Sequence, residues 1–273
     1  MFVKSNGSLL NSFAKLTSNR TSKNQFTEKL SSGKRINRAA DDAGGLSISE
    51  SLKAQVRGLS MAEKNTQDGI SMLQVADGAM EEITKTLHRM KELSVQASNG
   101  TLTDDDRQAI GEEFQQLKES IGNISENTEF NGIKLLKEDR TLVIQTRDNP
   151  YASYDVKLNN NSLTALGINS ININTIANSD ESNEKIKEAI DRVIKNRVEI
   201  GIHLNNLQHS FSNISNSGTN LTASLSQIED IDMATALMKS VKDDVLINYS
   251  KSMLEVAKQN NEGINTVINK WIL

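Results

Sequence analysis

The sequence predicts a mainly α-helical fold, in which long antiparallel coiled-coil helices form a rod with a small β-hairpin region near residues 140–160. Three observations lead to this prediction. Apolar residues recur in alternating steps of three and four over long stretches, which is the spacing of a coiled-coil seam. The 273 residues contain a single proline, so long helices can run without a break. Aromatic residues make up only 4% of the chain, which suits thin helical bundles.

The first 32 residues predict a weak amphipathic helix that Gly33 ends. Its apolar face is thin and interrupted, so the helix is not expected to be stable alone. The apolar positions on this face are Leu9, Phe13, Leu16, Phe26 and Leu30.

A connector of mixed charge follows at residues 32–45, where a continuous helix is not expected. A basic cluster could bind phosphate, but acidic residues stand among the basic ones, which favours a salt-bridged connector. Isolated ion pairs of this kind contribute little stability each. The charged residues of the connector are Lys34, Arg35, Arg38, Asp41 and Asp42.

Two further helices are predicted before the β region. The first has a regular seam from Ala62 to Ala97 and ends at Asn99-Gly100. Thr103 is expected to cap the next one, whose first turn holds three aspartates at 104–106. Three carboxylates could also suggest a cation site, but their position at a helix start explains them. The strands TLVIQT (141–146) and YDVKL (154–158) then predict a hairpin around the proline.

The longest regular seam runs from Ile186 to Ile228, and only Arg197 and Gly218 interrupt it. One helix of roughly 40 residues and about 60 Å is expected there. A last helix carries an apolar face to the end of the chain, which must be buried against something. We therefore expect other copies of the protein to cover both chain ends. The apolar face of the last helix consists of Leu246, Tyr249, Met253, Val256, Ile264, Val267, Ile268, Trp271 and Ile272.

The composition argues against several functional classes. The net charge is −4, which does not favour nucleic acid or an anionic membrane, and no run of about 18 apolar residues predicts a membrane span. There is no cysteine, and three scattered histidines do not form a metal motif; we expect His203 and His209 to be solvated. No catalytic motif is present, so we predict no enzyme activity and no cofactor. The first twenty residues lack the apolar block of a signal peptide.

Several stretches, in matching order and spacing, resemble bacterial flagellin over roughly residues 27–140 and 186–258. With about 60 residues between the third and the long helix, the chain resembles a short, core-only member without large outer variable domains. These stretches are KLSSGKRINRAADDAGGLSISE, NTQDGISMLQVADGAMEEI, LHRMKELSVQASNGT, NTEFNGIKLL and SQIEDIDMATA.

The resemblance implies three segments. Residues 1–43 and 231–273 would be terminal-helix segments inside a filament, and 44–230 a helical rod with the hairpin at about 130–170. Arg89, Leu93 and Glu113 match family positions used in subunit packing and, in many members, in recognition by a host Toll-like receptor. The connector would pack between neighbouring subunits.

The function expected from this resemblance is that of a structural subunit that polymerises into the extracellular flagellar filament for motility. It would be secreted through the flagellar channel, and its terminal helices would fold on assembly. Expected partners are further copies of itself, an export chaperone at residues 246–273, the filament cap and the hook-associated junction proteins. Both chain tips, MFVKSNGSLL and NNEGINTVINKWIL, depart from the family pattern. A hook–filament junction protein or a minor flagellin therefore stays an alternative, and a cytoplasmic signalling coiled coil is the alternative from another class.

Overall fold

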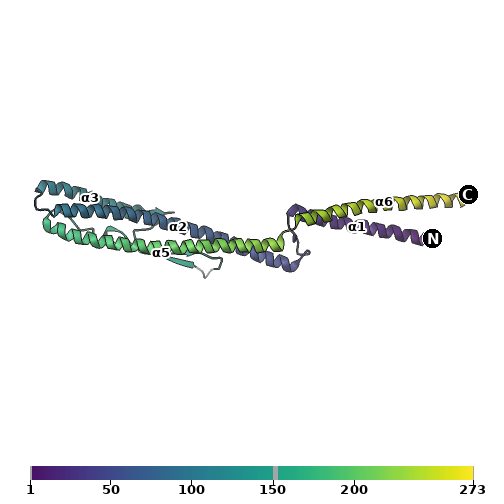
Figure 1. The fold of residues 1–273 in the computed structure, drawn as a ribbon, viewed down its shortest axis with the longest axis horizontal. Coiled ribbons are helices and arrows are strands. Elements are labelled where there is room, and N and C mark those ends of the chain that lie inside the picture. The colour runs from purple at the N-terminus through teal and green to yellow at the C-terminus, as the bar shows by residue number, and fades with distance from the viewer. Residues whose placement is uncertain (1, 150–152, 273) are drawn as a thin grey trace. The chain divides into compact units, whose positions relative to one another are not determined.

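The structure, a computed structural model, describes the backbone of residues 2–149 and 153–272 and the side chains of residues 10–149 and 153–259. Within this part, helices dominate and the strands form two small antiparallel sheets, which confirms the predicted fold class (Figure 1). The helices are α1 (Phe2–Ser32), α2 (Ala43–Ala97), α3 (Asp104–Asn127), α4 (Leu163–Leu166), α5 (Ile176–Glu229) and α6 (Met233–Ile272). The strands are β1 (Glu129–Phe130), β2 (Ile133–Lys134), β3 (Arg140–Gln145) and β4 (Ser153–Leu158).

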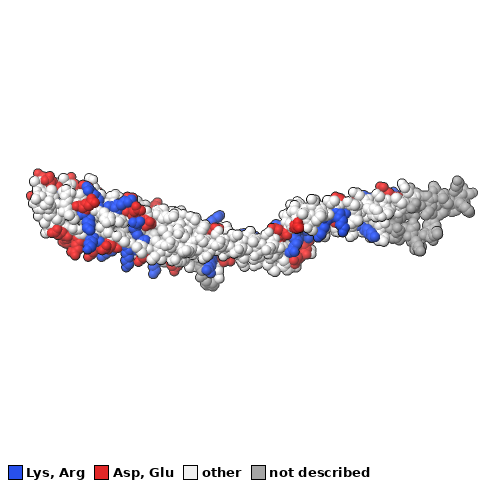
Figure 2. Space-filling model, in the orientation of Figure 1, with Lys and Arg blue, Asp and Glu red and all other residues white. Residues whose placement is uncertain are grey.

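The chain divides into two compact units. The first unit joins residues 1–54 with residues 221–273, and the second unit consists of residues 55–220. Helices α2 and α5 contribute to both. On the face of the second unit that Figure 2 shows, acidic and basic side chains lie interspersed.

The core of the second unit is the seam between α2 and α5, which run antiparallel. The seam predicted from Ala62 to Ala97 is buried throughout; Leu73, Ile83 and Leu87, for example, are fully inaccessible to solvent. Contacts fix the direction, because Ser94 Oγ donates to Ser179 O and Arg197 binds Asp77. Burying apolar side chains along this row supplies the main stabilisation, at about 1.5–3 kcal/mol for each large one.

Arg197, which interrupts the predicted seam of α5, is explained by an ion pair. Its Nε lies 2.9 Å from Asp77 Oδ1, and Nη2 lies 3.7 Å from Glu81 Oε2 on α2. The hydrogen bond from Arg197 to Asp77 raises the pKa of the guanidinium. A charged residue is tolerated at this half-buried position because its partner stands on the facing helix.

Helix α5 begins ten residues earlier than predicted. The missed turns continue the same seam through Ser179 and Ser182, which are buried at 0% and 2% exposure. Their hydroxyls donate to backbone carbonyls of residues 175 and 172. Serine at a seam position leaves no hydrophobic signal, so the apolar pattern started only at Ile186.

Helix α3 begins with the N-cap that the sequence predicts. The Thr103 hydroxyl accepts a hydrogen bond from Asp106 N, as expected for an N-cap. Arg107, 7% exposed, donates from its guanidinium to the carbonyls of Ala97 and Asn99 and so holds α3 against the end of α2. Phe114 and the following apolar positions then pack into the core.

The predicted hairpin is confirmed, with β3 and β4 paired from Arg140↔Leu158 to Gln145↔Ser153. Its proline lies outside the described residues. A second, very short hairpin joins β1 and β2 through Asn131 and Gly132, both at positive φ, which an Asn-Gly pair adopts readily.

The expectation that His203 is solvated is wrong. Its Nδ1 lies 2.8 Å from the Tyr154 hydroxyl, and the two rings meet edge to face at 5.6 Å. Asn206 Nδ2 donates to the same hydroxyl at 2.9 Å, so the group fastens β4 to α5. No local pattern indicates this contact, because Tyr154 and His203 are 49 positions apart.

The stability of the second unit should fall on mild acidification because of this histidine. Burial lowers the pKa of His203, the nearby Lys157 lowers it further, and Glu199 acts in the opposite direction. The unfolded chain therefore binds a proton at a higher pH than the folded chain, and stability decreases as the pH falls below about 6.5. Urea unfolding at pH 7.5 and 5.5 measures the loss, and His203→Gln should reduce it. An equal loss in both proteins would contradict the assignment to His203.

Candidate assembly surfaces

The first unit is built on the pair of helices α1 and α6, and their mutual interface is thin. Among the side chains of residues 10–32 and 233–259, the well-buried ones are Leu16 from α1 and Ala236, Ile247 and Ser250 from α6, at 2–8% exposure. Lys23 Nζ bonds Asp244 Oδ1 at 2.5 Å, and the Lys239 ammonium stands 5.6 Å from the centre of the Phe26 ring. So few buried side chains stabilise a long helix pair only weakly.

Much of the apolar surface of this pair points outwards. On α1, Leu10 and Phe13 are 70% and 61% exposed. On α6 the exposed apolar residues spread over the faces of the helix that do not carry Ala236 and Ile247, because a helix turns 100° per residue. Tyr249, Met253 and Val256 among them also line an open groove beside α1. Those α6 residues, each 43–66% exposed, are Leu237, Met238, Val241, Val245, Tyr249, Met253 and Val256.

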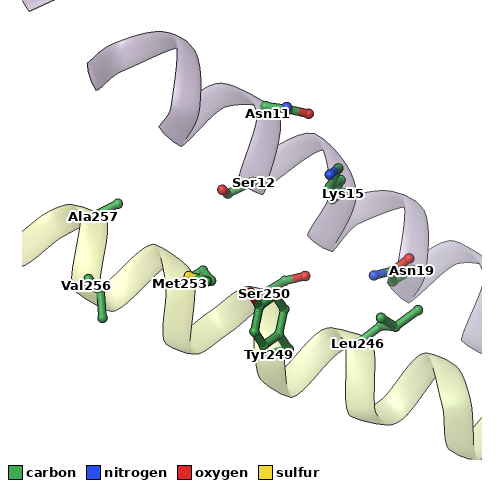
Figure 3. Close-up of a pocket in the computed structure, with 10 residues that line it drawn as sticks. All are labelled: Asn11, Ser12, Lys15, Asn19, Leu246, Tyr249, Ser250, Met253, Val256 and Ala257. Carbon is green, nitrogen blue, oxygen red and sulfur yellow. The ribbon is translucent and has the colours of Figure 1, made fainter. Parts of the chain in front are cut away.

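Between the two helices lies an open groove of about 720 Å³, whose walls differ in polarity (Figure 3). The α1 wall is polar and the α6 wall is largely apolar. A helix pair that were complete in itself would place apolar residues on both inner walls. Among the lining residues are Asn11, Ser12, Lys15 and Asn19 from α1 and Leu246, Tyr249, Met253 and Val256 from α6.

The structure thus locates part of the predicted terminal surface. Phe13, Tyr249, Met253 and Val256 are exposed, and Leu16 is buried between the helices. The remaining predicted residues lie outside the described side chains; these are Leu9, Ile264, Val267, Ile268 and Trp271.

The connector is held by a short backbone pairing to the α5–α6 junction. Lys34 forms an isolated β-bridge with Asp230, Arg35 N donates to Glu229 O at 2.6 Å, and Ile231 N donates to Gly33 O at 3.1 Å. The Arg35 guanidinium also donates to a carbonyl of this junction, that of residue 228, at 2.8 Å.

Glu229 is the buried charge at this junction. Its carboxylate, 6% exposed, lies 2.6 Å from Lys34 Nζ and 2.9 Å from Lys53 Nζ. Burial opposes ionisation, but the hydrogen bonds from both ammonium groups outweigh it, and the pKa of Glu229 is lowered. Glu229 and Lys53 were not predicted from the sequence, in which they stand 176 residues apart. The available signal for Glu229 was its position directly after the long apolar seam.

The other predicted connector residues form local contacts. Asp41 accepts from the backbone N–H groups of Asn37 and Arg38, which lowers its pKa. Asp42 accepts from Gly45 N at the start of α2, and Arg38 pairs with Glu28 on α1 at 2.9 Å. These contacts order the turn between α1 and α2.

Removing the Glu229 carboxylate should destabilise the first unit. Glu229→Gln is expected to cost about 1–3 kcal/mol at pH 7, because two ammonium groups lose a charged acceptor. The lowered pKa means that this stabilisation is present above the unfolded value of about 4.3 and is lost as the pH falls through the folded value. Thermal unfolding followed by circular dichroism measures both effects. Glu50→Gln, which removes only an exposed partner of Lys53, serves as control; an equal loss there would refute the role of Glu229.

The three positions singled out on the second unit lie close together but differ in exposure. Arg89 binds Glu113 of α3 at 2.8 Å and Glu92 at 3.2 Å, and both ends of the Arg89–Glu113 pair are about half exposed. The hydrogen bond to Glu113 is the main reason why the pKa of Arg89 is raised. Leu93 is only 1% exposed and packs in the core. The ion pair thus presents a polar surface, while Leu93 belongs to the core.

Comparison with known proteins decides the family. Residues 3–141 match the bacterial flagellin N-terminal helical region, and residues 184–264 match the bacterial flagellin C-terminal helical region. The chain belongs to the bacterial flagellin family. Flagellins are structural proteins of the extracellular flagellar filament, so the predicted structural and motility class is confirmed.

Similar flagellins cover nearly the whole chain. A flagellin of Halalkalibacterium halodurans is 38% identical over 267 residues, which cover 97% of this chain and 98% of that protein. A flagellin of Bacillus subtilis is 37% identical over 299 aligned residues, with the same coverage. This coverage favours a flagellin of the filament over the alternatives.

Solved structures agree with the fold. The crystal structure of Bacillus cereus flagellin is 29% identical, with a TM-score of 0.50, and covers 59% of this chain and 94% of its own. A putative flagellar hook-associated protein from Vibrio parahaemolyticus, 16% identical, has a TM-score of 0.59 over 70% of this chain and 100% of its own, which shows a shared fold alone. None of the described helices combines the length and apolar character that crossing a membrane would take.

Proposed function

We propose that this flagellin polymerises through its terminal helices, which other copies cover in the filament. The observation that carries the proposal is the exposed apolar surface of the α1–α6 pair: a polar α1 wall faces a largely apolar α6 wall across an open groove, and further apolar residues of both helices are exposed around it. Exposed apolar surface of this extent marks an interaction site. Covering it with neighbouring copies removes that surface from water.

The energetics couple folding to assembly. A helix pair with so few buried side chains is weak alone, whereas each large apolar side chain covered by a neighbour adds up to about 1.5–3 kcal/mol. We therefore assign residues 1–43 and 231–273 to inner filament segments that gain most of their stability on assembly, and residues 44–230 to a rod that folds independently.

The remaining partners follow from the same surfaces. An export chaperone would bind the apolar α6 face within residues 246–273 and keep the secreted chain from polymerising early. The filament cap and the hook-associated junction proteins would meet subunits at the filament ends. The role is structural, without catalysis or cofactor.

Receptor recognition is a second candidate function for the surface at Arg89 and Glu113. Their half-exposed ion pair is accessible on the second unit, whereas Leu93 is buried in the core. A host Toll-like receptor would therefore contact the polar pair directly. Binding of the receptor ectodomain to the wild type and to Arg89→Ala tests this, since equal affinities would exclude the site.

Assembly of purified protein, viewed by electron microscopy, tests the main proposal. The full-length chain should form long filaments, and a variant lacking residues 264–273 should stay monomeric. A full-length chain that stays monomeric with precipitant and filament seeds would overturn the filament role and favour a junction protein.

A further inference from the structure

The second unit carries an apolar row on the outside of α5 that its own fold leaves uncovered. Ile194, Val198 and Ile202 are 45%, 57% and 54% exposed. Their spacing of four places them along one side of the helix over about 12 Å. This side faces away from Val193 and Ile200, which are buried in the core.

The same unit has an open apolar groove where α2, the β1–β2 turn and β3 meet, with a volume of about 440 Å³. Val143 at the groove is 66% exposed, whereas its neighbour Ile144 is 9% exposed. A Cβ at Gly69 would lie only 2.5 Å from Ile144 Cδ1, so the hairpin sits tightly on α2. The apolar lining consists of Met72, Phe130, Ile133, Leu142, Val143 and Ile144.

We propose that Val198 and Ile202 of one copy seat in this groove of a neighbouring copy. The inference rests on the proposed function and adds a second contact to that of the terminal helices. A homopolymer that grows as an open filament, and does not close into a ring, needs two different, complementary surfaces on each chain. The exposed apolar row and the open apolar groove are complementary in this sense. The row lies on α5, whereas the groove is formed by α2, the β1–β2 turn and β3, so the two surfaces share no residue and one chain can use both at once.

The charges beside the two surfaces agree with this pairing. Lys195 is exposed next to the row, and Asp68 is exposed among the residues of the groove. Seating the C-terminal part of the row brings these opposite charges together at the rim, where they fix the orientation more than the affinity. Asp191 lies about one turn before the row, so in this arrangement it is outside the groove.

Cysteine cross-linking provides the test, because the chain has no cysteine of its own. Val198→Cys and Val143→Cys are made as separate proteins, copolymerised under reducing conditions and then oxidised. We expect a covalent dimer containing one of each, formed in filaments and absent from unassembled mixtures, because a disulfide requires Cβ atoms about 3.8 Å apart. Val198→Cys with Val95→Cys is the matched control, because Val95 is also exposed, at 54%, and lies outside the groove.

The outcomes separate this inference from the proposed function. Filaments that form normally without the cross-link, or with an equal yield in the control, overturn the contact and leave the filament role intact. A wild-type chain that never assembles overturns both. As an independent measurement, Ile202→Asp should raise the critical concentration for assembly at least about tenfold while leaving the circular dichroism of the monomer unchanged; an unchanged critical concentration also overturns the contact.

Discussion

Val241→Asp combined with Val245→Asp is expected to abolish filament formation by the purified protein. Both side chains are exposed on α6, at 54% and 62%, so the free chain should keep its fold. In the filament they would be covered, and losing two buried valines costs about 3 kcal/mol or more before the added charges are counted. Since 1.4 kcal/mol is a factor of ten, the critical concentration should rise more than about a hundredfold.

Sedimentation of assembled protein over a concentration series measures this effect. Val95→Asp combined with Ile176→Asp places the same two charges at exposed positions of the second unit and serves as control. We expect the control to assemble within about a factor of ten of the wild type. Assembly of the α6 variant at the wild-type concentration would refute the terminal-helix surface.

Leu93→Ala is expected to have the largest effect on the stability of the second unit among the three positions near the α2–α3 ion pair. Leu93 is 1% exposed in the main core, and emptying such a site costs about 2–5 kcal/mol. Arg89→Ala and Glu113→Gln remove a half-exposed ion pair and should each cost less than about 1 kcal/mol.

Urea unfolding of the three variants distinguishes the roles. If Leu93→Ala loses far more unfolding free energy than the other two variants, Leu93 has a packing role and the polar pair is available for recognition. Equal and small losses of stability in all three proteins would show that Leu93 is not in the core. Leu93 would then have to be counted with Arg89 and Glu113 as a surface residue. For this reason, receptor binding by Leu93→Ala should be compared only where the variant is fully folded.

The sequence alone determined the class of fold, because a heptad pattern is a local property. From Ala62 to Ala97 every predicted seam position is buried, and α3 begins at the predicted cap, Thr103. The hairpin strands came within one residue, since alternating apolar residues flanked a turn. The stretches that resemble flagellin likewise indicate the family, because they are local sequence motifs.

Tertiary structure decided what joins residues distant in sequence. Glu229 directly follows the long seam, but no local pattern shows that it binds Lys34 and Lys53. The contact of His203 with Tyr154 and the burial of the serines at the start of α5 carry no local signal either. A polar side chain is buried only where a partner from another element satisfies it, and periodicity cannot supply that partner. The same reason explains the assembly surface: the pattern showed that α1 and α6 are amphipathic, but only their packing showed which apolar residues remain outside.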